Sequence, residues 1–241
     1  AYDMVLRDWS SDVCSSDLSW KLFGLPDEFH ETRGAEPSPP LPVIEYVSDA
    51  DTVFPPKHHK DLRVEFLPGS LKDAIEAFVL VCAARRARGQ THCHNSMLIH
   101  VTRYNEVQEE VTALVRDHLH RLKQAIEYQT GPDYENLMER MEGRWHADFE
   151  QKRETVATLT GDTTLEAISW AQVRNELGVA MGKIQVKTVN GKVKDVLDYR
   201  DSADKGISVV AIGGDKLSRG LTLEGISISY FLRPTSLADT L

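Results

Sequence analysis

Residues 208–233 read SVVAIGGDKLSRGLTLEGISISYFLR, and this stretch decides the fold class. It begins with a short apolar run that ends in Gly213 and Gly214, passes through a polar turn, and returns after Gly225 to a second apolar run. Short apolar runs of this kind are typical of strands that are buried on both faces of a parallel sheet. The run SMLIHVT at residues 96–102 predicts a further strand of the same type.

Segments with the apolar spacing of helices lie before and between these strands in the sequence. Apolar residues recur at helical spacing over four stretches, at about residues 70–89, 105–126, 132–154 and 167–180. Ser70 can cap the first helix and Gly89 can end it, while Asn105 with Gln108 resembles a capping box for the second. A last strand is expected in KIQVKTVNG, before the turn signal at Asn190. The order of elements predicts an α/β domain with a largely parallel sheet, flanked by helices and carrying a helical insertion.

Composition narrows the function classes. The 241 residues carry a formal net charge of -9, which argues against a module that binds nucleic acid through bulk positive charge, so any such contact must be local. Three cysteines without paired spacing, Cys14, Cys82 and Cys93, suit a reducing compartment. No apolar run approaches the roughly 20 residues of a membrane span. A cytoplasmic protein without a membrane partner is therefore expected.

The amino-terminal third is expected to lie outside the folded domain. Residues 8–18, DWSSDVCSSDL, back-translate in one frame to a common short-read sequencing adaptor, so residues 1–18 are interpreted as foreign. Residues 19–69 hold many prolines and are interpreted as a linker or a surface wrapping. The domain is expected to occupy residues 70–241 as a fragment of a longer protein.

The glycines that end the strand at residues 208–214 indicate where chemistry is concentrated. Ligands of open α/β sheets collect at the carboxyl ends of the strands, and glycine there leaves backbone N–H groups accessible to a phosphate. The following turn supplies hydrogen-bond donors and charged groups: Asp215, Lys216, Ser218 and Arg219. Two interpretations stay open on spacing alone. The turn either faces a phosphate or is a tight connection in which Asp215 or Glu224 pairs with Arg219.

These motifs resemble known families. The apolar strand followed by Ser218-Arg219-Gly220-Leu221 looks like the fifth motif of superfamily II helicases. More closely, HNSMLIHVTRYNEVQ at residues 94–108 and GGDKLSRGLTLEGISISYFLR at residues 213–233 resemble the Z-one domain family. That family is labelled as an endonuclease domain, is helicase-like, and occurs in bacterial proteins associated with restriction and defence systems. The resemblance covers roughly residues 64–241.

The resemblance implies a RecA-like (P-loop NTPase-like) domain, the second of a nucleic-acid-dependent ATPase of the helicase or translocase type. It places a loop at the interdomain cleft, made of Gly213, Gly214, Asp215, Ser218, Arg219, Gly220 and Thr222, and it places Thr102 and Arg103 at the nucleic-acid backbone. Thr222 stands where the family pattern has an acidic residue. The resemblance further implies ATP and Mg²⁺ in the complete protein, neither of them bound by this chain alone, and three kinds of partner: DNA, with RNA left open, an N-terminal RecA-like domain, and restriction or defence proteins.

Two other functions stay open, and several motifs carry alternative interpretations. Asp133 with Glu150 and Lys152 matches the loose pattern of a metal-dependent DNA endonuclease, although that pattern requires strands and this region has helical spacing. A non-enzymatic protein-interaction domain is the second alternative. The cluster His92-Cys93-His94 lacks the fourth ligand of a structural zinc site and is interpreted as loop residues. His58 is interpreted as a surface residue, and Asp27-Glu28-Phe29-His30 as a chance match to a helicase signature.

Overall fold

The computed structural model describes residues 2–4, 43–160, 166–189, 205–214 and 223–232. Its sheet has the strand order β2-β1-β6-β3-β5-β4. Four neighbouring strands run parallel: β3 (Asn95–His100), β4 (Ile184–Val189), β5 (Ser208–Gly213) and β6 (Ile226–Phe231). The short strands β1 (Tyr2–Met4) and β2 (Ile44–Glu45) extend the sheet antiparallel beyond β6. The expected α/β fold with a largely parallel, RecA-like sheet is confirmed.

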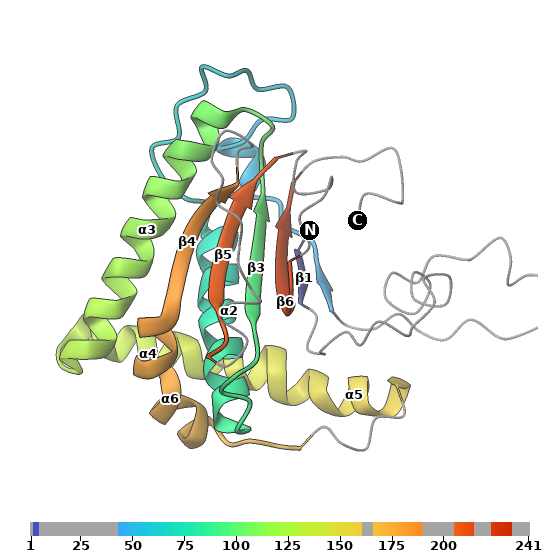
Figure 1. The fold of residues 1–241 in the computed structure, drawn as a ribbon, viewed down its shortest axis with the longest axis vertical. Coiled ribbons are helices and arrows are strands. Elements are labelled where there is room, and N and C mark those ends of the chain that lie inside the picture. Colours follow the sequence, from blue (N-terminus) through green and yellow to red (C-terminus); the bar gives the residue numbers. More distant parts are fainter. Residues whose placement is uncertain (1, 5–42, 161–165, 190–204, 215–222, 233–241) are drawn as a thin grey trace, which may run out of the picture.

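Helices flank this sheet. They are α2 (Gly69–Ala87), α3 (Asn105–Tyr128), α4 (Pro132–Arg144), α5 (Gln151–Thr160) and α6 (Trp170–Lys183). In Figure 1, α3 runs alongside β4, α2 lies behind the strands, and α4 and α5 cross the lower end of the view. A π-helical turn, Trp145–Glu150, joins α4 to α5 and completes the helical insertion. Within the described residues, no helix is both long and apolar enough to cross a membrane.

The two helices nearest the sheet differ in how they are buried. Helix α2 is buried around most of its circumference, with Leu71, Ile75 and Phe78 fully inaccessible, because it lies between the sheet and α6. Helix α3 buries a single stripe that includes Val107, Val111 and Val115 and exposes its other face. A one-sided stripe is the pattern of a surface helix, and the sequence periodicity predicted it.

The capping box expected at Asn105 and Gln108 is wrong. Tyr104 occupies the N-cap position of α3 and makes no capping bond through its side chain, while Gln108 turns inward and donates from Nε2 to the Thr102 carbonyl at 3.0 Å. The sheet edge competes successfully for this amide because Gln108 lies on the buried face of the helix. A true capping box forms instead at Ser169 and Gln172, which begins α6.

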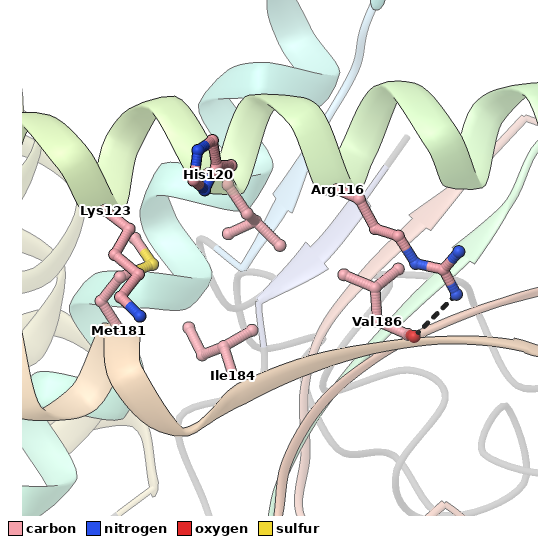
Figure 2. Close-up of a pocket in the computed structure, with 7 residues that line it drawn as sticks. Arg116, His120, Lys123, Met181, Ile184 and Val186 are labelled. Carbon is pink, nitrogen blue, oxygen red and sulfur yellow. Dashed lines mark hydrogen bonds between the residues drawn. The ribbon is translucent and has the colours of Figure 1, made fainter.

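Strand β4 lies at one end of the described sheet, and a shallow groove accompanies it. The groove has a volume of about 210 Å³ and lies beside the amino half of β4 (Figure 2); it is lined by Arg116, Leu119, His120, Lys123, Met181, Ile184 and Val186. The Arg116 guanidinium donates to the Val186 carbonyl at 3.4 Å.

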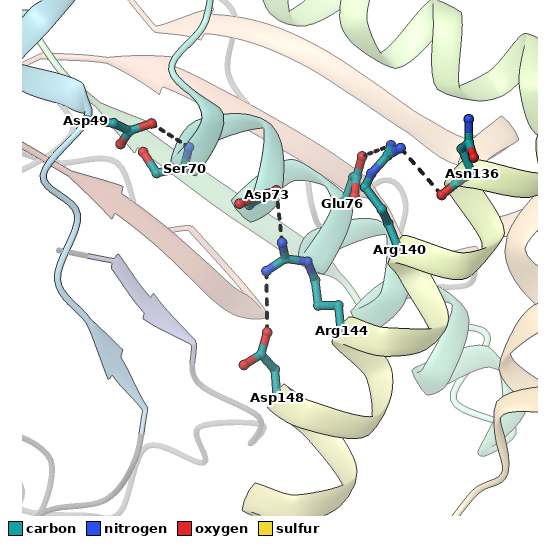
Figure 3. A network of polar contacts seen from close by, with 8 residues as sticks. All are labelled: Asp49, Ser70, Asp73, Glu76, Asn136, Arg140, Arg144 and Asp148. Carbon is teal, nitrogen blue, oxygen red and sulfur yellow. Dashed lines mark hydrogen bonds and ion pairs between the residues drawn. The ribbon is translucent and has the colours of Figure 1, made fainter. Parts of the chain in front are cut away.

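Residues 43–68, here called the strap, precede α2 and pack onto the domain. Five apolar side chains of the strap are buried: Ala50, Val53, Phe54, Val64 and Leu67. Asp49 accepts from the Ser70 backbone N–H at 3.0 Å and so caps α2 from outside the helix (Figure 3). The strap therefore contributes side chains to the hydrophobic core of the domain.

Ion pairs attach the helical insertion to α2. Arg140 of α4 contacts Glu76 of α2 at 2.7 Å, and Arg144 contacts Asp73 at 2.9 Å (Figure 3). Only 3% of Glu76 is exposed, so removing its partner would leave a buried carboxylate unpaired. Below them the Trp145 ring stacks on Phe149 with ring centroids 5.1 Å apart. Trp145 is buried and is therefore a core residue of the helical insertion.

Candidate functional site

The carboxyl edge of the sheet brings the two sequence motifs together. Strands β3 and β5 are parallel neighbours with Ile99 opposite Ile212, so the residues that follow them leave the sheet side by side. A Cβ atom added to Gly214 would lie 3.2 Å from the Thr102 carbonyl oxygen and 3.2 Å from the Arg103 Cα. Both distances are tighter than ordinary contacts of a Cβ atom. Close packing between two chain segments that are distant in sequence therefore favours glycine here.

Thr102 is held internally. It is only 3% exposed, and its hydroxyl lies 2.8 Å from His58 Nε2. The same oxygen accepts from the Tyr104 backbone N–H at 3.2 Å. These bonds use the hydroxyl within the protein, so Thr102 fixes the shape of the turn after β3.

Arg103 is an exposed cation of this edge. Its guanidinium lies 5.0 Å from the centre of the Tyr104 ring and donates to the Tyr104 hydroxyl at 2.9 Å. A cation over an aromatic face gains about 0.5–1 kcal/mol at exposed sites. Helix α3 begins directly after Tyr104, so the positive end of its dipole lies at the same edge. Exposed Arg103 and the helix end together form a locally positive turn.

Gln108 lies beneath this turn. It is 2% exposed, and its Nε2 atom lies 2.8 Å from the position that a Cβ on Gly214 would occupy. Its Oε1 atom has no hydrogen-bond partner among the described residues. Gln108 therefore connects the end of β3 to the end of β5 without contacting solvent.

The structure brings together four of the residues predicted from the sequence, namely Thr102, Arg103, Gly213 and Gly214. The other five predicted loop residues, Asp215, Ser218, Arg219, Gly220 and Thr222, lie outside the described residues. Sequence reasoning missed His58, Tyr104 and Gln108 as parts of this edge. His58 is half-buried, and its ring contacts the Thr102 hydroxyl across 44 residues, a contact for which the sequence gives no local signal.

The other motifs lie elsewhere. His100 is buried and stacks on Phe231 with ring centroids 4.6 Å apart, so it is a core residue. Asp133 lies in the first turn of α4 and Glu150 in the π-helical turn, so neither occupies a strand. In the part of the chain that is described, no three His, Cys, Asp or Glu side chains converge in a way that could hold a metal ion.

The amino edge of the sheet holds the His92-Cys93-His94 segment. His94 Nδ1 accepts from the Ile207 backbone N–H at 3.1 Å, and His94 Nε2 lies 3.8 Å from Glu224. Gly206 and Gly225, which lie just before β5 and β6, pack against the backbone of this segment. This segment therefore serves the packing of the sheet.

Comparison with known proteins gives one match. A family model described as the Z1 domain matches residues 70–241, well over half of the chain. The match begins at residue 70, in the first turn of α2 and at the expected start of the domain, and therefore leaves out the strap. Neither a curated protein nor a solved structure matches the chain.

Proposed function

The chain belongs to the Z1 domain family, and we propose that it contributes the nucleic-acid-binding and ATP-sensing face of a cleft in a helicase-like ATPase of a bacterial restriction or defence system. The observation that carries the proposal is the meeting of the turn after β3 with the glycine-ended strand β5 at the carboxyl edge of the sheet. In open α/β sheets this edge is where ligands bind.

The charges at this edge favour a phosphate backbone. The Arg103 guanidinium is planar and suits the geometry of a phosphate, and the adjacent start of α3 adds a positive dipole end. Two exposed carboxylates, Glu106 and Glu109, lie in the first turns of the same helix and oppose this field. We therefore expect binding that is weak, local and sensitive to salt.

ATP and Mg²⁺ would be held mainly by a second domain. The described residues include no cluster of three potential metal ligands, so we derive no step through Mg²⁺. What this chain can supply is a fixed cation and a close-packed glycine turn that respond to phosphate groups across a cleft. Proteins of restriction or defence systems would be the partners of the complete assembly.

The test is nucleic-acid binding by the full chain with Arg103→Ala. Fluorescence anisotropy with labelled single-stranded DNA, measured over a salt series, should show a loss of about fivefold or more in affinity. The magnitude of the salt slope should fall by about one because one phosphate contact is removed. The same anisotropy measurement with duplex DNA and with RNA of the same length shows which type of nucleic acid the chain prefers.

Arg116→Ala is the matched control, since it removes an arginine from α3, the helix that follows the Arg103 turn, at a position beside the groove on β4. Its affinity should equal that of the wild type. Equal losses for both variants would mean that only bulk charge is involved. Unchanged binding by Arg103→Ala would overturn the proposed role of the carboxyl edge.

A further inference from the structure

We infer that His58 is a positioning residue that holds the turn around Arg103 in shape. The part of the chain needed for binding then includes the strap as well as the residues that the Z1 domain model matches. The inference rests on the proposed function, because it assigns His58 a role in binding at the same edge. His58 lies twelve residues before the first residue that the Z1 domain model matches.

The hydrogen bonds of His58 have a fixed direction. Its Nδ1 atom faces the Pro55 carbonyl at 2.7 Å, and a carbonyl can only accept, so Nδ1 carries the hydrogen. In the neutral ring Nε2 is then an acceptor, and the Thr102 hydroxyl donates to it at 2.8 Å. The hydroxyl oxygen in turn accepts from the Tyr104 backbone N–H. A continuous chain of bonds thus runs from the strap into the turn.

A second contact reinforces the first. The His58 ring meets the Tyr104 ring edge-on, with centroids 5.8 Å apart and an interplanar angle of 71°. Tyr104 is the residue over which the Arg103 guanidinium lies. His58 therefore contacts the residues on both sides of Arg103, which limits the backbone and ring positions available to the turn.

The strap is itself fixed to the rest of the domain, and this restricts the movement of His58. Glu110 of α3 accepts from the Val64 backbone N–H at 2.8 Å and pairs with Arg63. Phe54 is buried in the core just before Pro55. In Figure 1 the strap is the blue-to-cyan segment that passes over the upper end of the strands, beside the start of α3.

Both ring nitrogens of His58 are occupied within the protein, which is why it acts through its neighbours. Fixing an arginine before a ligand arrives reduces the ordering cost of binding. Loss of the Thr102 bond should therefore weaken binding even though the charge of Arg103 remains.

The test compares His58→Phe with His58→Gln in the full chain. Phenylalanine keeps a ring beside Tyr104 but cannot accept from Thr102, whereas the Gln amide oxygen can accept at a similar reach. Anisotropy with single-stranded DNA should show about a three- to tenfold loss of affinity for His58→Phe and recovery of most of it for His58→Gln. His59→Phe, at the exposed neighbouring position, is the matched control and should bind like the wild type.

A double-variant cycle with Arg103→Ala separates positioning from general stability. If His58 acts through Arg103, His58→Phe should cause no further loss in the Arg103→Ala background. An equal further loss in that background would overturn the inference, as would wild-type affinity for His58→Phe.

Hydrogen exchange at the Tyr104 amide provides a readout that does not depend on nucleic acid. This amide bonds to the Thr102 hydroxyl, so its protection should fall in His58→Phe and return in His58→Gln. If the wild-type chain binds no nucleic acid, the proposed function fails and exchange alone decides on His58. Equal protection in His58→Phe and the wild type would then overturn the positioning role.

Discussion

The two ends of the parallel sheet use glycine for different purposes. At the amino edge, Gly206 and Gly225 adopt positive φ angles of 64° and 65°, and each packs against the backbone of residues 92–95. A Cβ on Gly225 would lie 2.0 Å from the His94 carbonyl oxygen, and one on Gly206 would lie 2.6 Å from that of Cys93. At this edge backbone packs on backbone, and neither glycine can be replaced without moving a strand.

The carboxyl edge is less tightly closed. Gly214 is not in the left-handed region, and the nearest atom to its added Cβ is the tip of the Gln108 side chain. Exposed Arg103 and half-buried Tyr104 lie directly beside it. From this difference we infer that the amino edge serves stability and the carboxyl edge serves binding. Two substitutions test this separation, and a third tests the anchor of the strap.

Gly225→Ala should have the largest effect. It combines a left-handed conformation for a non-glycine residue with a clash against backbone, and we expect the free energy of unfolding to fall by about 2–6 kcal/mol. Urea unfolding followed by circular dichroism measures this change. Gly143→Ala in α4, where an added Cβ meets nothing within 4 Å, is the control and should be neutral or stabilising by up to about 1 kcal/mol. Similar results for the two variants would contradict the assignment of the amino edge to stability.

Gly214→Ala should destabilise less and reduce binding more. Displacing the Gln108 amide should cost about 1–3 kcal/mol, because a side-chain tip can give way more easily than backbone. The shift of Arg103 should reduce affinity for single-stranded DNA by at least as much as His58→Phe does. Parallel unfolding and anisotropy measurements check both parts. A variant that loses stability but keeps full affinity would remove Gly214 from the binding edge.

Glu110→Gln should have the smallest effect, and it concerns the anchor of the strap. The hydrogen bond from the Val64 backbone, together with the Arg63 guanidinium, holds the pKa of Glu110 below its ordinary value. A lowered pKa in the folded state stabilises the protein above the ordinary carboxyl pKa and ceases to do so as pH falls through the lowered value. The variant should be less stable than the wild type by about 0.2–1 kcal/mol at pH 7.

This difference between Glu110→Gln and the wild type should narrow as the pH falls from the ordinary carboxyl pKa through the lowered one, because Glu110 is then protonated and becomes neutral, as Gln is at every pH. Urea unfolding at several pH values measures it. Glu109→Gln, at the exposed neighbouring position, is the control and should be as stable as the wild type at pH 7. A difference that stayed constant with pH would mean that the Glu110 carboxylate does not anchor the strap through its charge.

Local patterns predicted most of the elements because they depend on residues near one another in the chain. The apolar run at 208–213 is β5, the periodic stretch from Ser70 is α2 with Gly89 just beyond its end, and the stripe from Val107 lies on α3. The capping box failed because the buried edge of the sheet competed for the Gln108 amide. Capping and helix propensities depend only on the residues of the segment itself, whereas the hydrogen bond that the Gln108 amide forms depends on which part of the protein packs beside the segment.

The sequence by itself determined the α/β class, the parallel strands and the pairing of glycines with a polar turn, because periodicity and glycine content act over a few residues. Only the tertiary structure decided that Gly214 packs on the Thr102–Arg103 turn and that His58 reaches the same turn from the strap. The strand order places β3 beside β5, and the strap crosses their ends. Such contacts join residues 44 and more positions apart, and no local preference encodes them.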